Sequence, residues 1–137
     1  MSVKKRDRET SKAQFIETAR KLEIFALRFC VSQIPKRYSF YIGQPLVKLA
    51  VDIHTHTIEA NSLYPTNRHE AQIRRDRFND VKAELHALIS QVGVLLEMFD
   101  NVNKSKVEEW MKMIKYEIDL IKGVMNSDKE RAKKLPE

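Results

Sequence analysis

The apolar residues between Asn67 and Met125 recur at alternating spacings of three and four, and this rhythm constrains the fold more than any other feature of the chain. Such spacings average about 3.5 residues and place one apolar stripe along a helix, whereas a strand would need a period of two. The sequence therefore predicts two long helices. Their stripes comprise Phe78, Val81, Leu85, Leu88, Val92, Leu95 and Phe99 in the first half, and Val107, Met111, Ile114, Ile118, Ile121 and Met125 in the second.

A short polar break at 100–104 separates these two helices, which we expect at 68–99 and 106–126. Asn67 is the expected N-cap of the first, with Glu70 three residues on. Ser105 is the expected N-cap of the second, with Glu108 in the capping-box position. Two long helices joined by a short turn fold back antiparallel to bury their stripes, and a pair alone needs further partners.

The first half of the chain supplies two more helices. Phe15, Leu22 and Phe29 lie seven residues apart in a helix that we expect to end near Gln33, because Pro35 disfavours helical geometry at Ile34. A second helix, with Pro45 in its first turn, should run to about residue 61. We expect Gly43 to provide backbone freedom just before it, and Ser11 to cap the first helix with Gln14. The inner face expected for the second helix comprises Leu46, Leu49, Ala50, Ile53, Thr57 and Ile58.

These patterns predict an all-α protein, an antiparallel up-down-up-down four-helix bundle over residues 12–127. A disordered basic N-terminus at 1–11 and a basic C-terminal tail at 128–137 would flank it. No run approaches the roughly 18–20 apolar residues of a membrane span, so we expect no membrane partner. Cys30, the only cysteine, is expected to be a small buried residue in a reducing compartment, which indicates a cytoplasmic protein.

The titratable residues do not form a catalytic or metal-binding pattern. None of the four histidines has a Glu three positions before it, as inward-facing di-iron motifs require. His54 and His56 point about 200° apart on a helix, so His54 is expected to border the core with its polar edge satisfied. The chain has no glycine-rich phosphate loop and no nucleophile elbow. We therefore predict no enzyme activity, no cofactor and no metal.

The formal charge of +6 and the pI near 9.5 admit a polyanionic partner. Arginines crowd the start of the third helix, and a connector at 35–43 combines two basic residues with Tyr38, Phe40 and Tyr41. Guanidinium groups suit phosphates, and exposed aromatic rings suit unpaired bases. The alternative is that the charges only solvate the bundle while the aromatics cap its end.

Apolar residues beside the main stripes widen them beyond a narrow coiled-coil seam. A stripe of this width is most commonly explained by residues at the edge of the core, but it also fits burial against a second subunit, so a homo-oligomer is a further expectation. The widening residues are Phe25, Leu27, Val47, Val51, Val94 and Leu96.

Several short segments resemble a known group of bacterial four-helix bundles. They are Ile34-Pro35-Lys36-Arg37-Tyr38, Ile42-Gly43-Gln44 and the stretch from Asp52 to Ile58-Glu59-Ala60-Asn61. With the layout of residues 68–125, they are similar to the 23S intervening-sequence (S23-type) proteins. The likeness is closer to the accessory variability determinant proteins of diversity-generating retroelements. One departure is Gly123-Val124-Met125, where the family tends to have Gly-Gly-Trp.

The resemblance implies a homopentameric barrel with a basic outer surface. It implies a non-catalytic accessory that binds RNA or cDNA and the retroelement reverse transcriptase, and so supports mutagenic copying. Binding would be electrostatic, on one arginine-rich face, with little base readout. The alternatives are an S23-type ribosome- or RNA-associated bundle and a pure protein–protein scaffold. The residues implied for nucleic-acid binding are Arg20, Lys36, Arg37, Lys48, Arg74, Arg75 and Arg77.

Overall fold

The computed structural model describes residues 14–137, and in this part of the chain every regular element is helical. The all-α class predicted from the apolar spacing is therefore confirmed. The disorder expected at 1–11 and the cap expected at Ser11 lie outside the described residues. None of the helices described is both long and apolar enough to cross a membrane. The four long helices are α1 (Ser2–Gln33), α2 (Gln44–Ser62), α3 (Arg68–Met98) and α4 (Lys104–Ala132).

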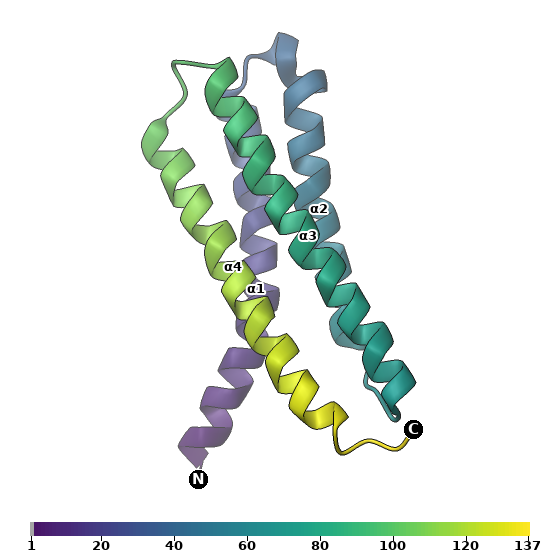
Figure 1. Cartoon of the computed structure of the whole chain (residues 1–137). Coiled ribbons are helices and arrows are strands. Elements are labelled where there is room, and N and C mark those ends of the chain that lie inside the picture. Colours follow the sequence, from purple (N-terminus) through teal and green to yellow (C-terminus); the bar gives the residue numbers. More distant parts are fainter. Residues whose placement is uncertain (1) are drawn as a thin grey trace.

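The four helices form a bundle in which each packs against two neighbours (Figure 1). Helix α1 packs against α2 and α4, and α3 packs against the same two helices. Successive helices run in opposite directions in Figure 1. The α1–α2 and α3–α4 connections therefore lie at one end, here called the upper end, while the α2–α3 connection and the C-terminus lie at the lower end.

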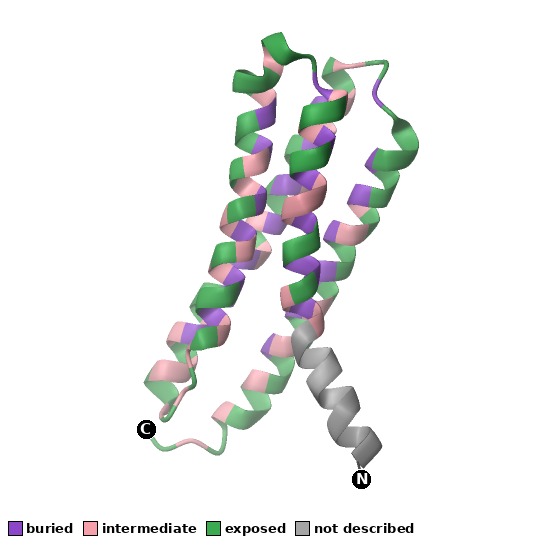
Figure 2. Cartoon of the chain, turned by 180° about the vertical axis from the view of Figure 1, so that it is seen from behind, coloured by how far each residue is buried: buried purple, intermediate pink, exposed green. Residues whose placement is uncertain are grey.

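The core follows the predicted stripes closely on α3 and less closely on α2 and α4 (Figure 2). On α2, Leu46, Ala50 and Ile53 are buried as expected, but Ile58 is exposed and faces away from the core. Its position is taken by Ala60, which keeps the 3–4 rhythm from Ile53 through Thr57. The α3 side chains that are buried as predicted are Phe78, Val81, Leu85, Leu88, Val92 and Leu95.

The seam of α4 contains two residues that the sequence prediction left out, Trp110 and Glu117. The buried series runs through positions 107, 110, 114, 117 and 121, at spacings of three and four throughout. Trp110 packs against both Phe25 and Phe29 of α1, and its ring centroid lies 5.5 Å from that of Phe25 and 5.0 Å from that of Phe29. Met111, which was expected in the seam, is only partly buried beside it.

Helix caps account for where α3 and α4 begin. Asn67 caps α3 as predicted, because its Oδ1 accepts the backbone N–H of Glu70 at 2.8 Å. The carboxylate of Glu70 accepts the backbone N–H of Thr66 and its hydroxyl, and these bonds lower the pKa of Glu70. The cap predicted at Ser105 is wrong. Asn103 is the N-cap of α4, and its Oδ1 accepts the N–H of Lys106 at 3.2 Å.

The α1–α2 connector is helical rather than irregular. Helix α1 ends at Gln33 as predicted, and a 3₁₀ turn η1 (Lys36–Tyr38) and a π-helical turn η2 (Ser39–Gly43) follow. Pro45 lies in the first turn of α2, also as predicted. The role expected for Gly43 is wrong. Its φ of −67° and ψ of −51° are ordinary helical values, because η2 continues directly into α2.

In the basic C-terminal segment expected at 128–137, the first residues are helical and the last ones lie against the bundle. Helix α4 continues to Ala132, and the last residues cross to the start of α3. There the backbone N–H of Arg68 donates to the carbonyl of Pro136 at 2.9 Å, and its Nε donates to the carbonyl of Leu135 at 3.1 Å. The segment thereby closes the lower end against α3.

Glu117 is fully buried in the core, and neither of its carboxylate oxygens has a hydrogen-bond partner. Burial raises the pKa of Glu117 to about 9, because a charge is costly in a medium of low polarity. The side chain is therefore protonated at neutral pH. In the unfolded chain the carboxyl group ionises near pH 4.5. Between pH 4.5 and pH 9, folding is therefore accompanied by uptake of a proton. The free energy of unfolding consequently falls as the pH rises from about 4.5 to about 9.

We predict that Glu117→Leu stabilises the protein at pH 8 by about 2–4 kcal/mol, because it removes an unpaired polar group from the core. The gain should shrink as the pH approaches 4.5, where the unfolded chain no longer favours the ionised form. Urea unfolding followed by circular dichroism at both pH values measures this. The exposed Glu108→Leu on the same helix is the matched control and should shift stability by no more than about 0.5 kcal/mol. A destabilised Glu117→Leu would show that Glu117 has a partner in the folded protein.

Candidate nucleic-acid interface

The residues predicted to bind nucleic acid do not share one face. Lys36 and Arg37 lie in η1 at the upper end, whereas Arg75 and Arg77 lie in the first turns of α3 at the lower end. The 19-residue helix α2 spans the distance between them, which is about 28 Å at ~1.5 Å per residue. The single arginine-rich face expected from the sequence is therefore not formed.

Arg74 is buried and serves the fold, which corrects its assignment to the interface. Its Nε donates to Oδ2 of Asp128 on α4 at 2.7 Å, and its guanidinium carbon lies 5.0 Å from the ring centroid of Phe78. With only 9% of its side chain exposed, Arg74 offers a phosphate no approach. Its Nη1 also donates to backbone carbonyls at the end of α2, those of Ala60, Asn61 and Leu63, at 3.3, 3.4 and 3.1 Å.

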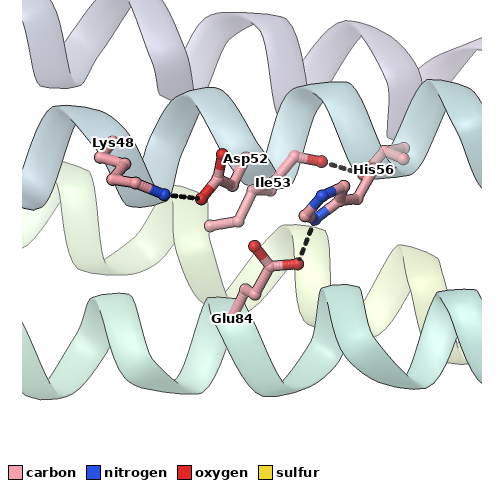
Figure 3. A network of polar contacts seen from close by, with 6 residues as sticks. Lys48, Asp52, Ile53, His56 and Glu84 are labelled. Carbon is pink, nitrogen blue, oxygen red and sulfur yellow. Dashed lines mark hydrogen bonds and ion pairs between the residues drawn. The ribbon is translucent and has the colours of Figure 1, made fainter.

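Arg20 and Lys48 are exposed and each is paired along its own helix. Arg20 lies 3.2 Å from Glu17, and Lys48 lies 3.0 Å from Asp52 (Figure 3). Exposed pairs of this kind contribute little stability, typically below about 1 kcal/mol, so a phosphate replaces the carboxylate at small cost. Both cations remain available to an anionic partner.

Arg75 and Arg77 follow Arg74 on α3 and have different environments. Arg75 is half-buried, while Arg77 is exposed and has no ion pair in the described part of the chain. At the lower end they have no exposed aromatic neighbour from the connector. Arg75 and Arg77 are therefore not part of the same surface as the basic residues of the connector.

The connector brings exposed aromatic and basic side chains together at the upper end. Phe40 is 67% exposed and Tyr41 is 75% exposed, and their rings meet edge to face with centroids 5.5 Å apart. We call Lys36, Arg37, Phe40, Tyr41 and Lys48 the connector patch. This set combines three cations with two rings that are open to solvent.

The third aromatic of the connector has a different role. Tyr38 is half-buried and packs edge to face on Phe99, with ring centroids 5.2 Å apart. The guanidinium of Arg37 lies 4.9 Å from the Tyr38 ring centroid, a cation–π contact that holds Arg37 at the bundle end. The hydroxyl of Ser39 donates to the carbonyl of Lys36 at 2.8 Å. These contacts position the patch, while Tyr38 itself is not free to stack on a ligand.

A hollow of about 860 Å³ lies beside the connector patch, between α1 and α2. Cys30 borders it, and burial raises the pKa of its thiol to about 11, so the thiol is not an activated nucleophile. Its Sγ–H points toward the carbonyl of Gly43 at 3.8 Å. The apolar lining includes Leu27, Val31, Phe40, Pro45 and Val47.

The two histidines of α2 join that helix to both of its neighbours. Nδ1 of His54 lies 3.1 Å from Oε1 of Glu23 on α1, which confirms that the polar edge of His54 is satisfied. Nδ1 of His56 lies 2.7 Å from Oε1 of Glu84 on α3 (Figure 3), and this hydrogen bond raises the pKa of His56. No group of three or more potential metal-ligating side chains is found in residues 14–137.

The sequence matches no protein-family model, and comparisons with curated proteins and with solved structures find no match. The resemblance to the accessory variability determinants therefore stays a prediction based on the short motifs.

The predicted set omitted three cations that line one groove between α1 and α4, namely Lys21, Arg28 and Lys106. Lys21 and Arg28 lie seven residues apart, and this helical spacing is visible in the sequence. Their proximity to Lys106 depends on how α1 packs against α4, so no local pattern indicates it.

We predict that Arg74→Met destabilises the protein by about 3 kcal/mol, because it leaves Asp128 and the carbonyls at the end of α2 without their donor. Urea denaturation at pH 7 measures the loss. Arg77→Met removes the same charge from the neighbouring turn and should stay within about 0.5 kcal/mol of the unchanged protein. Equal effects of the two variants would mean that charge alone, rather than the buried contacts, accounts for the loss.

Proposed function

We propose that this protein is a non-catalytic nucleic-acid-binding protein that holds a single-stranded segment of RNA or cDNA at the connector patch. The observation that carries the proposal is the exposure of Phe40 and Tyr41 among Lys36, Arg37 and Lys48. Aromatic side chains are usually largely buried, so two adjacent exposed rings among cations indicate a surface that a ligand covers.

The chemistry of the patch suits a single strand better than a duplex. Unpaired bases stack on aromatic rings, which contributes roughly 1–3 kcal/mol per base. The cations neutralise the backbone phosphates, a contribution that weakens as salt rises. Every base has an aromatic face, so stacking on Phe40 and Tyr41 gives affinity with little sequence preference.

The sequence resemblance supplies the biological context of the proposal. The protein would act as the accessory of a diversity-generating retroelement, binding the reverse transcriptase and the RNA or cDNA, while the transferase chemistry belongs to that partner. An S23-type ribosome- or RNA-associated role would use the same stacking surface. A reverse transcriptase gene and a repeat-flanked template next to this gene would favour the retroelement.

A second candidate, self-association, is favoured by the exposed apolar residues on the outer face of α1 and α2. Val31 is 85% exposed, and Leu27, Val51 and Ile58 are also exposed. These four residues, here called the outer apolar face, lie at helical spacings on adjacent helices. We propose that a second copy of the chain covers this face, as part of a pentamer if the resemblance holds.

We predict that Phe40→Ala/Tyr41→Ala weakens binding of a fluorescein-labelled 20-nucleotide RNA without base pairing by about tenfold or more at 50 mM salt. Tyr64→Ala/Tyr116→Ala removes two exposed rings elsewhere and should leave the affinity unchanged. Lys36→Ala/Arg37→Ala should reduce the log–log salt slope by about 1.4, or ~0.7 per phosphate contact. Fluorescence anisotropy gives both quantities. A chain that binds no RNA at low salt, or equal losses in the two aromatic variants, would contradict the proposal.

We predict that light scattering coupled to size exclusion gives a mass above that of one subunit, and near five if the resemblance holds. Val31→Glu should lower this mass, because it places a charge in the outer apolar face. Ala87→Glu introduces the same charge on the exposed side of α3 and should leave the mass unchanged. A protein that is monomeric before any substitution would overturn the self-association proposal and leave nucleic-acid binding untouched.

A further inference from the structure

A second hollow, here called the α1/α4 groove, lies on the side of α1 away from the hollow at the connector patch. Its volume is about 440 Å³. Basic side chains border an apolar floor formed by Ile24, Phe25, Phe29 and Met113. The groove therefore offers apolar contact and positive charge to the same ligand.

The charge of the α1/α4 groove is not neutralised by its own chain. Lys21, Arg28 and Lys106 border it, with Glu109 as the one carboxylate among its lining residues. In the described residues none of the three cations makes an ion pair, in contrast to Arg20, which lies beside Glu17. Lys21 and Arg28 are seven residues apart, so they lie on the same side of α1 and about 10 Å apart along it. A row of cations with this spacing suits a ligand with repeated negative charges.

The α1/α4 groove adjoins the connector patch across the width of a single helix. Leu27 and Val31 of α1 line the hollow beside the patch, whereas the next residues, Arg28 and Ser32, line the groove. A helix with its side chains is about 10–12 Å wide, which a few nucleotides of an extended strand cross. Lys106, in the first turn of α4, lies at the same upper end of the bundle.

We infer that the α1/α4 groove is the second part of one nucleic-acid site, an inference that rests on the proposed function. A single strand whose bases stack on Phe40 and Tyr41 passes the C-terminal end of α1, beyond the outer apolar face, and places its phosphates against Lys21, Arg28 and Lys106. The exposed aromatic rings of the connector patch lie only one helix width from the groove, and this proximity favours a nucleic-acid strand over an acidic peptide. Ribose and base edges contact the apolar floor, so this part of the site adds affinity without reading sequence.

Trp110 provides a built-in reporter for the groove. It is the only tryptophan of the chain and is fully buried. It packs directly on Phe25 and Phe29, which form the groove floor. A strand seated in the groove should alter the emission of Trp110, whereas a strand confined to the connector patch should not.

The test compares Lys21→Glu/Arg28→Glu with Lys122→Glu/Lys129→Glu. The control pair is also seven residues apart and exposed, lies on α4 outside the groove, and changes the net charge by the same amount. Oligo(U) of 5 and 15 nucleotides is titrated at 50 and 200 mM salt, with anisotropy and Trp110 emission as readouts. Circular dichroism confirms that both variants are folded.

We expect the groove variant to bind 15-nucleotide oligo(U) at least tenfold more weakly than the control variant. Its salt slope should be lower by about 1.4, as two lost phosphate contacts imply. In the unchanged protein, Trp110 emission should respond to the 15-mer and much less to the 5-mer. In the groove variant the response to the 15-mer should be lost.

The outcomes separate the two proposals. No binding by the unchanged protein overturns both the proposed function and the groove inference. Binding that depends on Phe40 and Tyr41, with equal affinities of the groove and control variants and a silent Trp110, overturns the groove inference alone. A groove variant that loses binding to poly-glutamate but keeps its affinity for oligo(U) also overturns it, and indicates an acidic protein partner.

Discussion

Burial of apolar seams with a period of 3.5 residues is the constraint on which the rest of this structure depends. Each helix exposes too much apolar surface to be stable alone, and in the bundle every seam is covered by two neighbours. The directions of the helices then decide which connections meet. The connector after α1 and the start of α4 lie at one end because α1 and α4 pack side by side and run in opposite directions.

Two ionisable side chains, those of Arg74 and Glu117, are buried in the bundle, and their surroundings differ. Asp128 and the carbonyls at the end of α2 replace the hydrogen bonds to water that the guanidinium of Arg74 loses on burial. That arrangement ties α2, α3 and α4 together at the lower end. Glu117 has no such partner and is held protonated instead, which makes the protein less stable as the pH rises.

The proposed binding surfaces occupy the opposite, upper end, where the chain does not need to bury its aromatics. Tyr38 packs on Phe99 and anchors the connector, which leaves Phe40 and Tyr41 in solvent. Helix α1 separates the connector patch from the α1/α4 groove and contributes residues to both hollows. The exposed side chains of the patch and the groove cations are distinct from the buried Arg74 and Asp128, so binding and this stabilising contact can be altered separately by mutation.

The sequence by itself determined the features set by neighbours within about one helical turn. Pro35 ends α1, Asn67 caps α3, and the seam of α3 follows directly from its apolar spacing. Arg74 lies four residues before Phe78, at the end of the α3 seam, but only the tertiary structure decided that Asp128 and the end of α2 bury it while Arg77 faces solvent. It also decided that Glu117 is in the core, and that Lys21 and Arg28 share a groove with Lys106. These arrangements depend on how one helix is rotated against the next, and an amphipathic pattern with a wide apolar face is compatible with more than one rotation.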